Sequence, residues 1–233
     1  MRWTGDDRPP PGSRRLKEAG YLLARAARGL GHLGPRGPED GPPALVIPGF
    51  IANDRTTMEL RRALAEAGWR VHSWGLGWNL GVRADILERL EQCIDRMGAK
   101  QPVLVVGWSL GGLYARELAR HCPEKIRAVV TLGSPFSGDL HQNNVWRLYE
   151  LIAGHKVDDT PIPRIVDKPP VPSLAIWSRK DGIVAPRAAR GLEGERDETV
   201  EVGCAHMAFA VSRKATRQVV REIHSFLKKN AGK

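Results

Sequence analysis

From residue 44 onward the chain alternates short apolar runs with amphipathic segments, and this pattern constrains the fold more than any other feature. Short apolar runs separated by segments of helical periodicity are typical of buried parallel strands joined by helices. We predict strands at 44–48, 69–74, 102–106, 126–132, 171–177 and 199–202, and helices at 57–67, 82–97, 110–121 and 212–228. The expected fold class is therefore α/β, with a mostly parallel central sheet and helices on both faces.

The strand expected at 102–106 runs directly into a glycine-bounded turn and then a helix. The turn reads Gly-Trp-Ser-Leu-Gly at 107–111, with Ser109 at its centre. In so sharp a turn the glycines let the backbones approach closely, and the central side chain projects from the carboxyl edge of the sheet. The first amides of the following helix favour negative charge at the same point. Ser109 is therefore the candidate nucleophile, and the alternative is a serine that merely caps the helix.

A serine hydroxyl becomes a good nucleophile only when a base takes its proton. The chemistry therefore requires a carboxylate and a histidine, which follow in the order serine, acid, histidine. Asp181 lies before Gly182 in a loop after the apolar run 171–177, and His206 lies in a loop after the run 199–202. These two positions predict the acid and the base of a catalytic triad.

Other histidines and aspartates remain as competitors, but their positions suit the roles less well. The remaining histidines fall inside predicted helices or strands, in the N-terminal zone or in an irregular segment, and the rival acids all belong to that segment. They are His32, His72, His121, His141, His155 and His224, and Asp139, Asp158, Asp159 and Asp167.

Acyl transfer also requires two backbone amides that stabilise a tetrahedral oxyanion. One donor should be Leu110, the residue after the nucleophile. The second should come from the loop at 48–52, where Gly49 permits unusual backbone geometry and Phe50 or Ile51 supplies the amide. A simple turn that ends the first strand is the alternative interpretation of this loop.

The motifs together resemble the α/β-hydrolase superfamily, in its esterase/lipase-like branch. The resemblance spans about residues 43 to 229 and rests on Val-Ile-Pro-Gly-Phe at 46–50, Gly-Trp-Ser-Leu-Gly-Gly at 107–112, Thr-Leu-Gly-Ser-Pro at 131–135, Ser-Arg-Lys-Asp-Gly-Ile-Val at 178–184 and Ala-His at 205–206. The run at 73–81 also looks like a stretch found in small bacterial lipase-like proteins.

The resemblance implies that Ser109 is the nucleophile, that His206 acts first as base and then as acid, and that Asp181 orients the histidine. It implies no cofactor and no metal. The chain departs from many relatives at Pro48, because these relatives have His-Gly where this sequence has Pro-Gly. This difference bears on the details of the oxyanion pocket.

The amino-acid composition of the chain limits the kinds of partner that it can bind. The chain has 233 residues, enough for one sizeable core, and a formal net charge of +10. Its basic residues are interleaved with acidic ones and form no aromatic and basic platform, which favours a solvated surface and no nucleic-acid partner. The three cysteines are odd in number and lack metal-type spacing, so we expect reduced thiols, with Cys204 as a packing residue.

Two segments lie outside the regular pattern. Residues 1–42 form an N-terminal extension with an expected amphipathic helix at 13–30, which could pack on the domain, cover a pocket or lie on a membrane. Residues 43–233 form the hydrolase domain, in which 133–170 is expected to be a small lid with a short helix at 144–152. No signal peptide and no apolar stretch near the roughly 20 residues of a membrane span is present. We therefore expect a cytoplasmic protein, with peripheral contact to an anionic membrane as an open alternative.

The predicted function is hydrolysis of carboxylic esters through an acyl-enzyme on Ser109. The apolar side chains expected in the lid suggest an apolar or lipid-like acyl group as part of a small-molecule substrate; they are Phe136, Val145, Trp146, Leu148 and Leu151. An acyltransferase with the same triad and a non-catalytic binding protein of the same fold are the alternatives. The sequence leaves the oligomeric state open.

Overall fold

A computed structural model describes residues 10–11, 13–14, 18, 36–138, 161–162 and 165–230. The predicted helix at 13–30 and the expected lid at 133–170 fall largely outside these residues, and the expected helix at 144–152 falls wholly outside them. Within the predicted N-terminal helix, Ser13, Arg14 and Glu18 are described and have helical backbone geometry.

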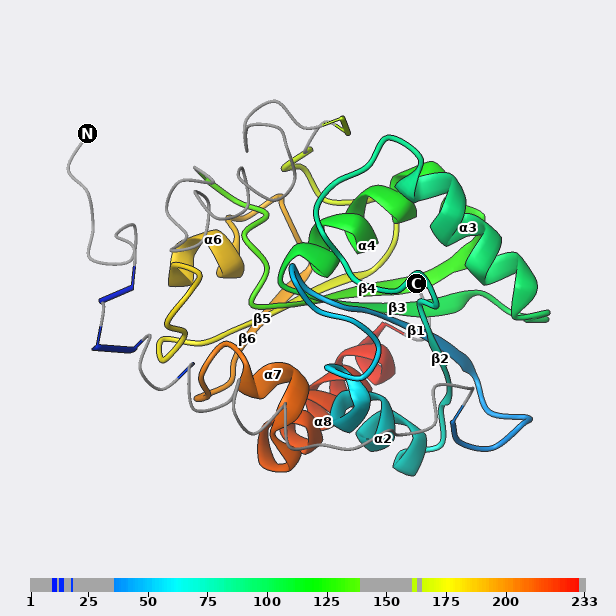
Figure 1. Ribbon diagram of the computed structural model, residues 1–233, viewed down its shortest axis with the longest axis horizontal. Helices are drawn as coiled ribbons and strands as arrows, with labels where there is room; N and C mark the ends of the chain where they lie inside the picture. The colour runs from blue at the N-terminus through cyan, green and yellow to red at the C-terminus, as the bar shows by residue number, and fades with distance from the viewer. Residues whose placement is uncertain are drawn as a thin grey trace.

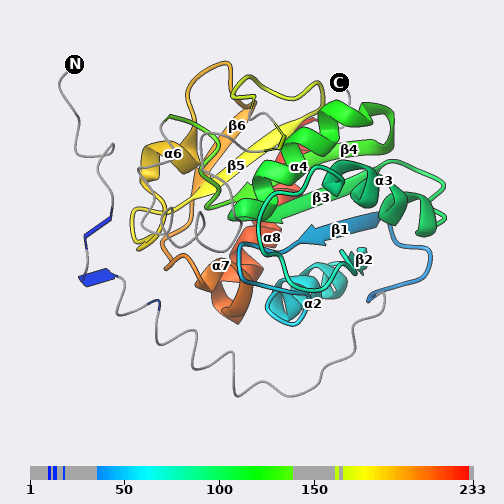
Figure 2. The same cartoon turned by 45° about the horizontal axis from the view of Figure 1, so that its top comes forward.

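Six parallel strands form the centre of the molecule (Figure 1). They are β1 (Pro43–Ile47), β2 (Arg70–Ser73), β3 (Val103–Trp108), β4 (Ile126–Leu132), β5 (Ser173–Trp177) and β6 (Glu198–Glu201). Their order across the sheet is β2-β1-β3-β4-β5-β6, so β2 and β6 form the two edges (Figure 2). The predicted parallel α/β sheet is confirmed, with strand ends that differ from the expected ones by a few residues at most.

Helices cover both faces of the sheet. One face carries α3 (Ile86–Arg96) and α4 (Leu110–His121), and the other carries α2 (Met58–Glu66), α7 (Ala208–Val211) and α8 (Arg213–Lys229) (Figure 1). Alternate residues of β1 serve the two faces, because Ala44 and Val46 belong to one hydrophobic cluster while Leu45 and Ile47 belong to the other. Strands buried on both sides lack a polar face, which is why they read in the sequence as continuous apolar runs.

Three short elements were not predicted from the sequence. They are the 3₁₀ helix η2 (Pro123–Lys125), α6 (Pro186–Arg190) and α7. Each is five residues or shorter, too short to show helical periodicity. None of the helices within the described ranges is long and apolar enough to cross a membrane.

The register of the sheet places the predicted site loops side by side. Gly107 of β3 lies opposite Ile47 of β1 on one side and Thr131 of β4 on the other. Because all six strands run in the same direction, the loops after β1, β3, β4, β5 and β6 leave the same edge of the sheet. This is the carboxyl edge, where ligands of open α/β sheets bind.

Phe136 has a different role from the one expected of a lid residue. Its side chain is completely buried, and the guanidinium of Arg116 lies 4.3 Å from the centre of its ring. Phe136 therefore packs in the interior of the domain. The other four apolar residues expected in the lid fall outside the described residues.

Arg116 of α4 ties two loops to the core. Its buried guanidinium donates hydrogen bonds to the carbonyl oxygens of Glu195 (2.9 Å), Val166 (2.7 Å) and Asp167 (2.8 Å). Hydrogen bonds between a charged group and backbone carbonyls are stronger than neutral ones, and a buried carbonyl without a donor is costly. Arg116 thus stabilises the chain on both sides of β5.

We expect the Arg116→Ala substitution to lower the free energy of unfolding by about 3 kcal/mol, because it leaves the buried carbonyl of Glu195 without its donor and removes packing from Phe136. Urea denaturation followed by circular dichroism measures this change. Arg221→Ala, at an exposed position of α8, is the matched control and should stay within about 0.5 kcal/mol of the wild type. Equal unfolding midpoints for the two variants would contradict this role of Arg116.

Candidate active site

The turn at 107–111 holds Ser109 in a strained backbone conformation. Its φ of 54° and ψ of −122° make it one of two non-glycine residues with positive φ in the described part of the chain. An ordinary N-cap residue has extended geometry and a side chain that accepts an amide hydrogen bond. Ser109 has neither, since φ is positive and its side chain makes no capping hydrogen bond. The alternative of a simple helix-capping serine therefore does not fit.

Glycines make this turn possible. A Cβ atom on Gly107 would lie 2.2 Å from the carbonyl oxygen of Gly111, and one on Gly111 would lie 2.4 Å from that of Ile47. The start of α4 is thus pressed against the end of β1. The amide of Ser109 also donates to the carbonyl of Leu132 (2.9 Å), which fixes the turn against β4.

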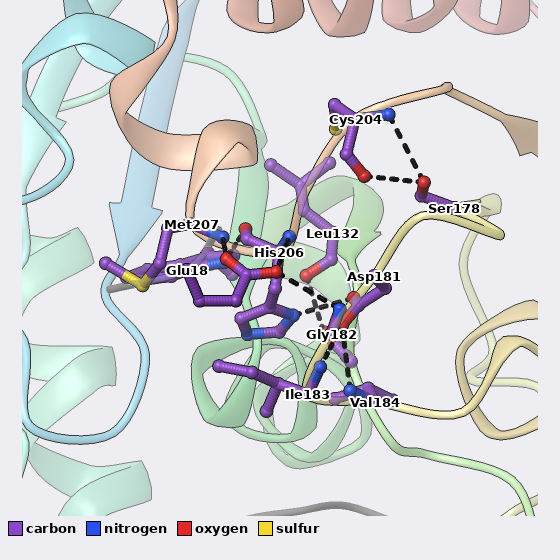
Figure 3. Close-up of polar contacts among 12 residues, drawn as sticks. Glu18, Leu132, Ser178, Asp181, Gly182, Ile183, Val184, Cys204, His206 and Met207 are labelled. Atoms are coloured by element: carbon purple, nitrogen blue, oxygen red, sulfur yellow. Dashed lines mark hydrogen bonds and ion pairs between the residues drawn. The ribbon is translucent and has the colours of Figure 1, made fainter. Parts of the chain in front are cut away.

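Asp181 and His206 form a buried pair. Their side chains are joined by a 2.7 Å hydrogen bond between Asp181 Oδ2 and His206 Nδ1, and both residues are at most 2% exposed (Figure 3). The other carboxylate oxygen of Asp181 accepts hydrogen bonds from the amides of Ile183 (2.7 Å) and Val184 (2.8 Å). Both oxygens are therefore held, and the carboxylate has a fixed orientation toward the histidine ring.

The loops that carry this pair are joined to each other by Ser178. Its hydroxyl donates to the carbonyl of Cys204 (2.6 Å) and accepts from the Cys204 amide (3.2 Å). Val202 also donates to the carbonyl of Trp177 (2.8 Å). The loop after β5 and the loop after β6 are thereby fixed relative to one another.

Trp108 connects the Asp181–His206 pair to the serine turn at 107–111. Its indole N–H donates to the carbonyl of His206 (3.2 Å), and the centres of the two rings lie 5.6 Å apart. Since Ser109 follows Trp108, the serine turn and the histidine lie at the same end of the sheet. No hydrogen bond joins the Ser109 hydroxyl to the His206 ring among the described residues, and such contacts in free enzymes often tighten only when substrate binds.

Gly133 explains the motif at 131–135. It has a φ of 55°, and a Cβ atom there would lie 3.0 Å from Asp181 Oδ2 and 3.1 Å from His206 Nδ1. The end of β4 thus passes directly beside the Asp–His hydrogen bond. Only glycine combines this backbone conformation with so little space.

Burial and the neighbouring carboxylates have opposite effects on the pKa of His206. Burial alone would lower the pKa of His206, because it penalises the charged imidazolium. The carboxylate of Asp181 opposes this effect by its charge and its hydrogen bond, and the carboxylate of Glu18 adds a smaller contribution. The pKa of His206 consequently lies above its ordinary value.

The loop at 48–52 lies against Ser109. A Cβ atom on Gly49 would lie 3.0 Å from the Cβ of Ser109. Ile51, the second non-glycine residue with positive φ, donates its amide to the carbonyl of Asn79 (2.7 Å). Of the two predicted candidates for the second oxyanion donor, Ile51 has its amide bonded to this carbonyl, and the choice of Phe50 as the donor stays a prediction.

Asn79 organises this loop and was not recognised in the sequence. Its side-chain amide donates to the carbonyl of Pro48 (2.8 Å), while its side-chain oxygen accepts from the hydroxyl of Tyr114 (3.2 Å). The residue is buried, and its backbone pairs with Ala52. Asn79 lies within the run 73–81, whose resemblance to lipase-like proteins was the only signal that could have indicated it.

Glu18 is the second residue that the sequence did not indicate. Its carboxylate is buried and accepts hydrogen bonds from the amides of Gly182, His206 and Met207 (Figure 3). A single glutamate in a basic segment carries no signal for such a contact, because the partner amides lie more than 160 residues further along the chain.

The competing acids and bases have other surroundings where they are described. His224 accepts from the indole N–H of Trp69 (2.9 Å), and His121 pairs with Glu91 at 2.9 Å. His72 is half-buried, and burial lowers its pKa. Asp167 has an exposed side chain. The rivals His32, His141, His155, Asp139, Asp158 and Asp159 fall outside the described residues.

Cys204 is close to His206 in sequence but unsuited to act as a nucleophile. Burial raises the pKa of its thiol to about 12, so the reactive thiolate form is suppressed. All three cysteines are free thiols. Within the described ranges, no group of three or more histidine, cysteine or acidic side chains is arranged to hold a metal ion.

A parallel sheet whose carboxyl edge carries a strained strand-to-helix serine turn defines an architecture of the α/β-hydrolase type. The sequence agrees, because residues 42–161 match the family model described as alpha/beta hydrolase fold. The chain belongs to this family, and the resemblance predicted from its motifs is confirmed. No curated protein matches the sequence.

Solved structures share the fold at low sequence identity. A membrane phospholipase A described as a bacterial virulence factor superposes with a TM-score of 0.63 at 14% identity, covering 95% of this chain and 93% of that chain. An α/β-hydrolase enzyme from a sediment metagenome of the Mar Chica lagoon gives 0.61 at 21% identity, covering 88% and 100%. Carboxylesterase CesB from Bacillus subtilis gives 0.56 at 15%, covering 93% and 99%. These likenesses extend over nearly the whole fold.

We expect Gly107→Ala to destabilise the protein by about 3 kcal/mol or more, because its methyl group would overlap the backbone at Gly111 and force the turn open. Thermal and urea unfolding measure the loss. Gly203→Ala is the control, since a Cβ there meets nothing closer than the end of Lys180 at 3.7 Å. A Gly107→Ala protein as stable as Gly203→Ala would show that the turn does not need this close approach.

Proposed function

We propose that this protein is a serine hydrolase that cleaves carboxylic esters through an acyl-enzyme on Ser109. The observation that carries the proposal is the buried hydrogen bond between Asp181 and His206, located beside the strained serine turn. The order serine, acid, histidine along the chain agrees with this assignment. Solved structures with the same fold include a carboxylesterase and a phospholipase A, which supports an ester as the class of substrate.

In the first half of the reaction, Ser109 Oγ attacks the carbonyl carbon of the ester. His206 Nε2 takes the hydroxyl proton, since its Nδ1 is occupied by the hydrogen bond to Asp181. The charge of Asp181 stabilises the imidazolium that forms. The tetrahedral oxyanion accepts hydrogen bonds from the amides of Leu110, at the start of α4, and Phe50.

The imidazolium then gives its proton to the leaving alcohol, and the carbon–oxygen bond of the ester breaks. A water molecule, deprotonated by His206, attacks the acyl-enzyme and releases the carboxylic acid and free Ser109. Asn79 supports both halves by holding the Pro48 carbonyl and the Ile51 amide on either side of Phe50. The oxyanion donor is thereby fixed before the charge develops.

We propose an apolar or lipid-like acyl group as part of the substrate. A cavity of about 250 Å³ adjoins Asn79, and its lining residues include Trp74, Leu76, Trp78 and Leu80 together with Arg83 and Arg89. Trp78 and Leu80 are among the few large apolar side chains that are more than half exposed. An apolar surface next to the oxyanion loop suits a hydrocarbon chain.

Labelling of Ser109 tests the proposal most directly. We expect a fluorophosphonate probe to modify the wild type at Ser109, and Ser109→Ala to lose labelling and at least about 1,000-fold in kcat for p-nitrophenyl ester hydrolysis. Ser225→Ala, at an exposed position of α8, is the control and should keep both. Unchanged hydrolysis in Ser109→Ala would refute the assignment, and a wild type inert to probe and esters would favour a non-catalytic binding protein.

The pH dependence tests the acid–base pair. A protonated His206 cannot accept the serine proton, so kcat/KM should fall as the pH drops through a pKa that lies above the ordinary value for histidine. Asp181→Asn removes the charge that raises this pKa, so the acidic limb should move to lower pH while kcat falls at least about 100-fold. Asp40→Asn, at an exposed site, is the control. If the acidic limb stayed in place in Asp181→Asn, Asp181 would not be the residue that raises the pKa of the base.

A further inference from the structure

The carboxylate of Glu18 lies between two loops of the site that are distant from it in sequence. Its Oε1 accepts hydrogen bonds from the amides of Gly182 (3.1 Å) and His206 (2.7 Å), and its Oε2 accepts one from the amide of Met207 (2.9 Å) (Figure 3). Gly182 follows the proposed acid, and Met207 follows the proposed base. One side chain thus bridges the two loops that carry the proton-transfer pair.

The contact does not rest on Glu18 alone. Arg14 lies one helical turn before it, and its guanidinium donates to the carbonyl of Arg179 in the loop after β5. Gly182 also packs closely on this segment, because a Cβ atom there would lie 2.9 Å from the carbonyl oxygen of Arg14. Two described residues of the N-terminal extension therefore contact the same loop.

Burial makes the carboxylate important for geometry. Glu18 is 4% exposed, so water does not readily replace it as the acceptor for these amides. Backbone N–H groups that are buried without an acceptor destabilise the folded protein. Without Glu18 the loops would have to shift in order to expose these amides, and the Asp181–His206 hydrogen bond lies between them.

We propose that Glu18 is a positioning residue for the proton-transfer pair: it clamps the loops of Asp181 and His206 together and places a second negative charge beside the imidazole. This inference rests on the proposed function for its consequence in catalysis. The hydrogen bonds of Glu18 go to these two loops, so it acts through them.

Among the described residues, Asp181 and Glu18 are the two carboxylates that raise the pKa of His206. Asp181 lies on the ring from the loop after β5, Glu18 lies on the backbone side from the N-terminal extension, and Trp108 of β3 is uncharged. Cys204, on the histidine's own loop, keeps a neutral thiol. Loss of the Glu18 charge should therefore lower the pKa of His206 while Asp181 still holds the ring.

Two substitutions separate geometry from charge. Glu18→Ala removes all three acceptor contacts and the charge, whereas Glu18→Gln removes the charge but keeps an amide oxygen that can serve the amides of Gly182 and His206. We expect kcat to fall about tenfold to 100-fold in Glu18→Ala and less in Glu18→Gln, with KM changed by less than about threefold. In both variants the acidic limb of kcat/KM should move to lower pH.

Glu39→Ala and Glu39→Gln are the matched controls, because Glu39 is an exposed glutamate of the same extension. They should leave kcat and the acidic limb unchanged. A purely structural role for Glu18 would lower the melting temperature without moving the acidic limb. Wild-type kcat and an unmoved limb in both Glu18 variants would overturn the inference while leaving the proposed hydrolase function intact.

Two readouts work even if the protein hydrolyses no ester. The ring proton of His206, followed by NMR against pH, should titrate at lower pH in Glu18→Gln than in the wild type. Hydrogen exchange of peptides that contain Gly182 and the 206–207 amides should be at least about tenfold faster in Glu18→Ala. Unchanged titration and exchange would refute the clamp, whereas a probe-inert wild type in which both change would refute only the hydrolase function.

Discussion

The organisation of the site depends on the close approach of backbones around the turn at 107–111. Gly107 and Gly111 have no side chains, so α4 can begin against β1 and force Ser109 into its positive φ. A side chain at either glycine would push the start of α4 away from the carboxyl ends of β1 and β4. The loop at 48–52, the serine and Gly133 all take their positions from this contact. Sheet register and steric exclusion bring the site loops to one edge of the sheet, and hydrogen bonds such as that between Asp181 and His206 fix them there.

Much of this arrangement could be predicted from the sequence, because parallel strands carry strong local signals. The run at 44–48 is apolar throughout and that at 126–132 is apolar apart from Arg127 and Thr131, since both faces of the sheet are covered, and the serine turn has its own glycine pattern. Asp181 and His206 could be selected because parallel strands deliver their following loops to one edge. Their pairing at 2.7 Å follows from that topology.

The residues that the sequence did not indicate act through long-range contacts without a local signature. Asn79 uses both its backbone and its side chain to hold the loop at 48–52, which follows β1. A single asparagine in a glycine-rich run has no pattern that specifies this. Glu18 reaches amides beyond the fifth strand. Phe136 lies in an irregular segment, and only the position of Arg116 shows that it belongs to the interior.

The bond between Glu18 and the His206 amide spans 188 positions of the chain, and this separation has a consequence for biosynthesis. A ribosome delivers residues in order, so β1 to β5 can emerge and pair while the segment that carries the histidine is still inside the exit tunnel. Glu18 must wait without its partner at His206 until 188 further residues have been made. A nascent chain therefore holds the serine turn well before it holds His206, and the Asp181–His206 pair forms only after β6 has been made.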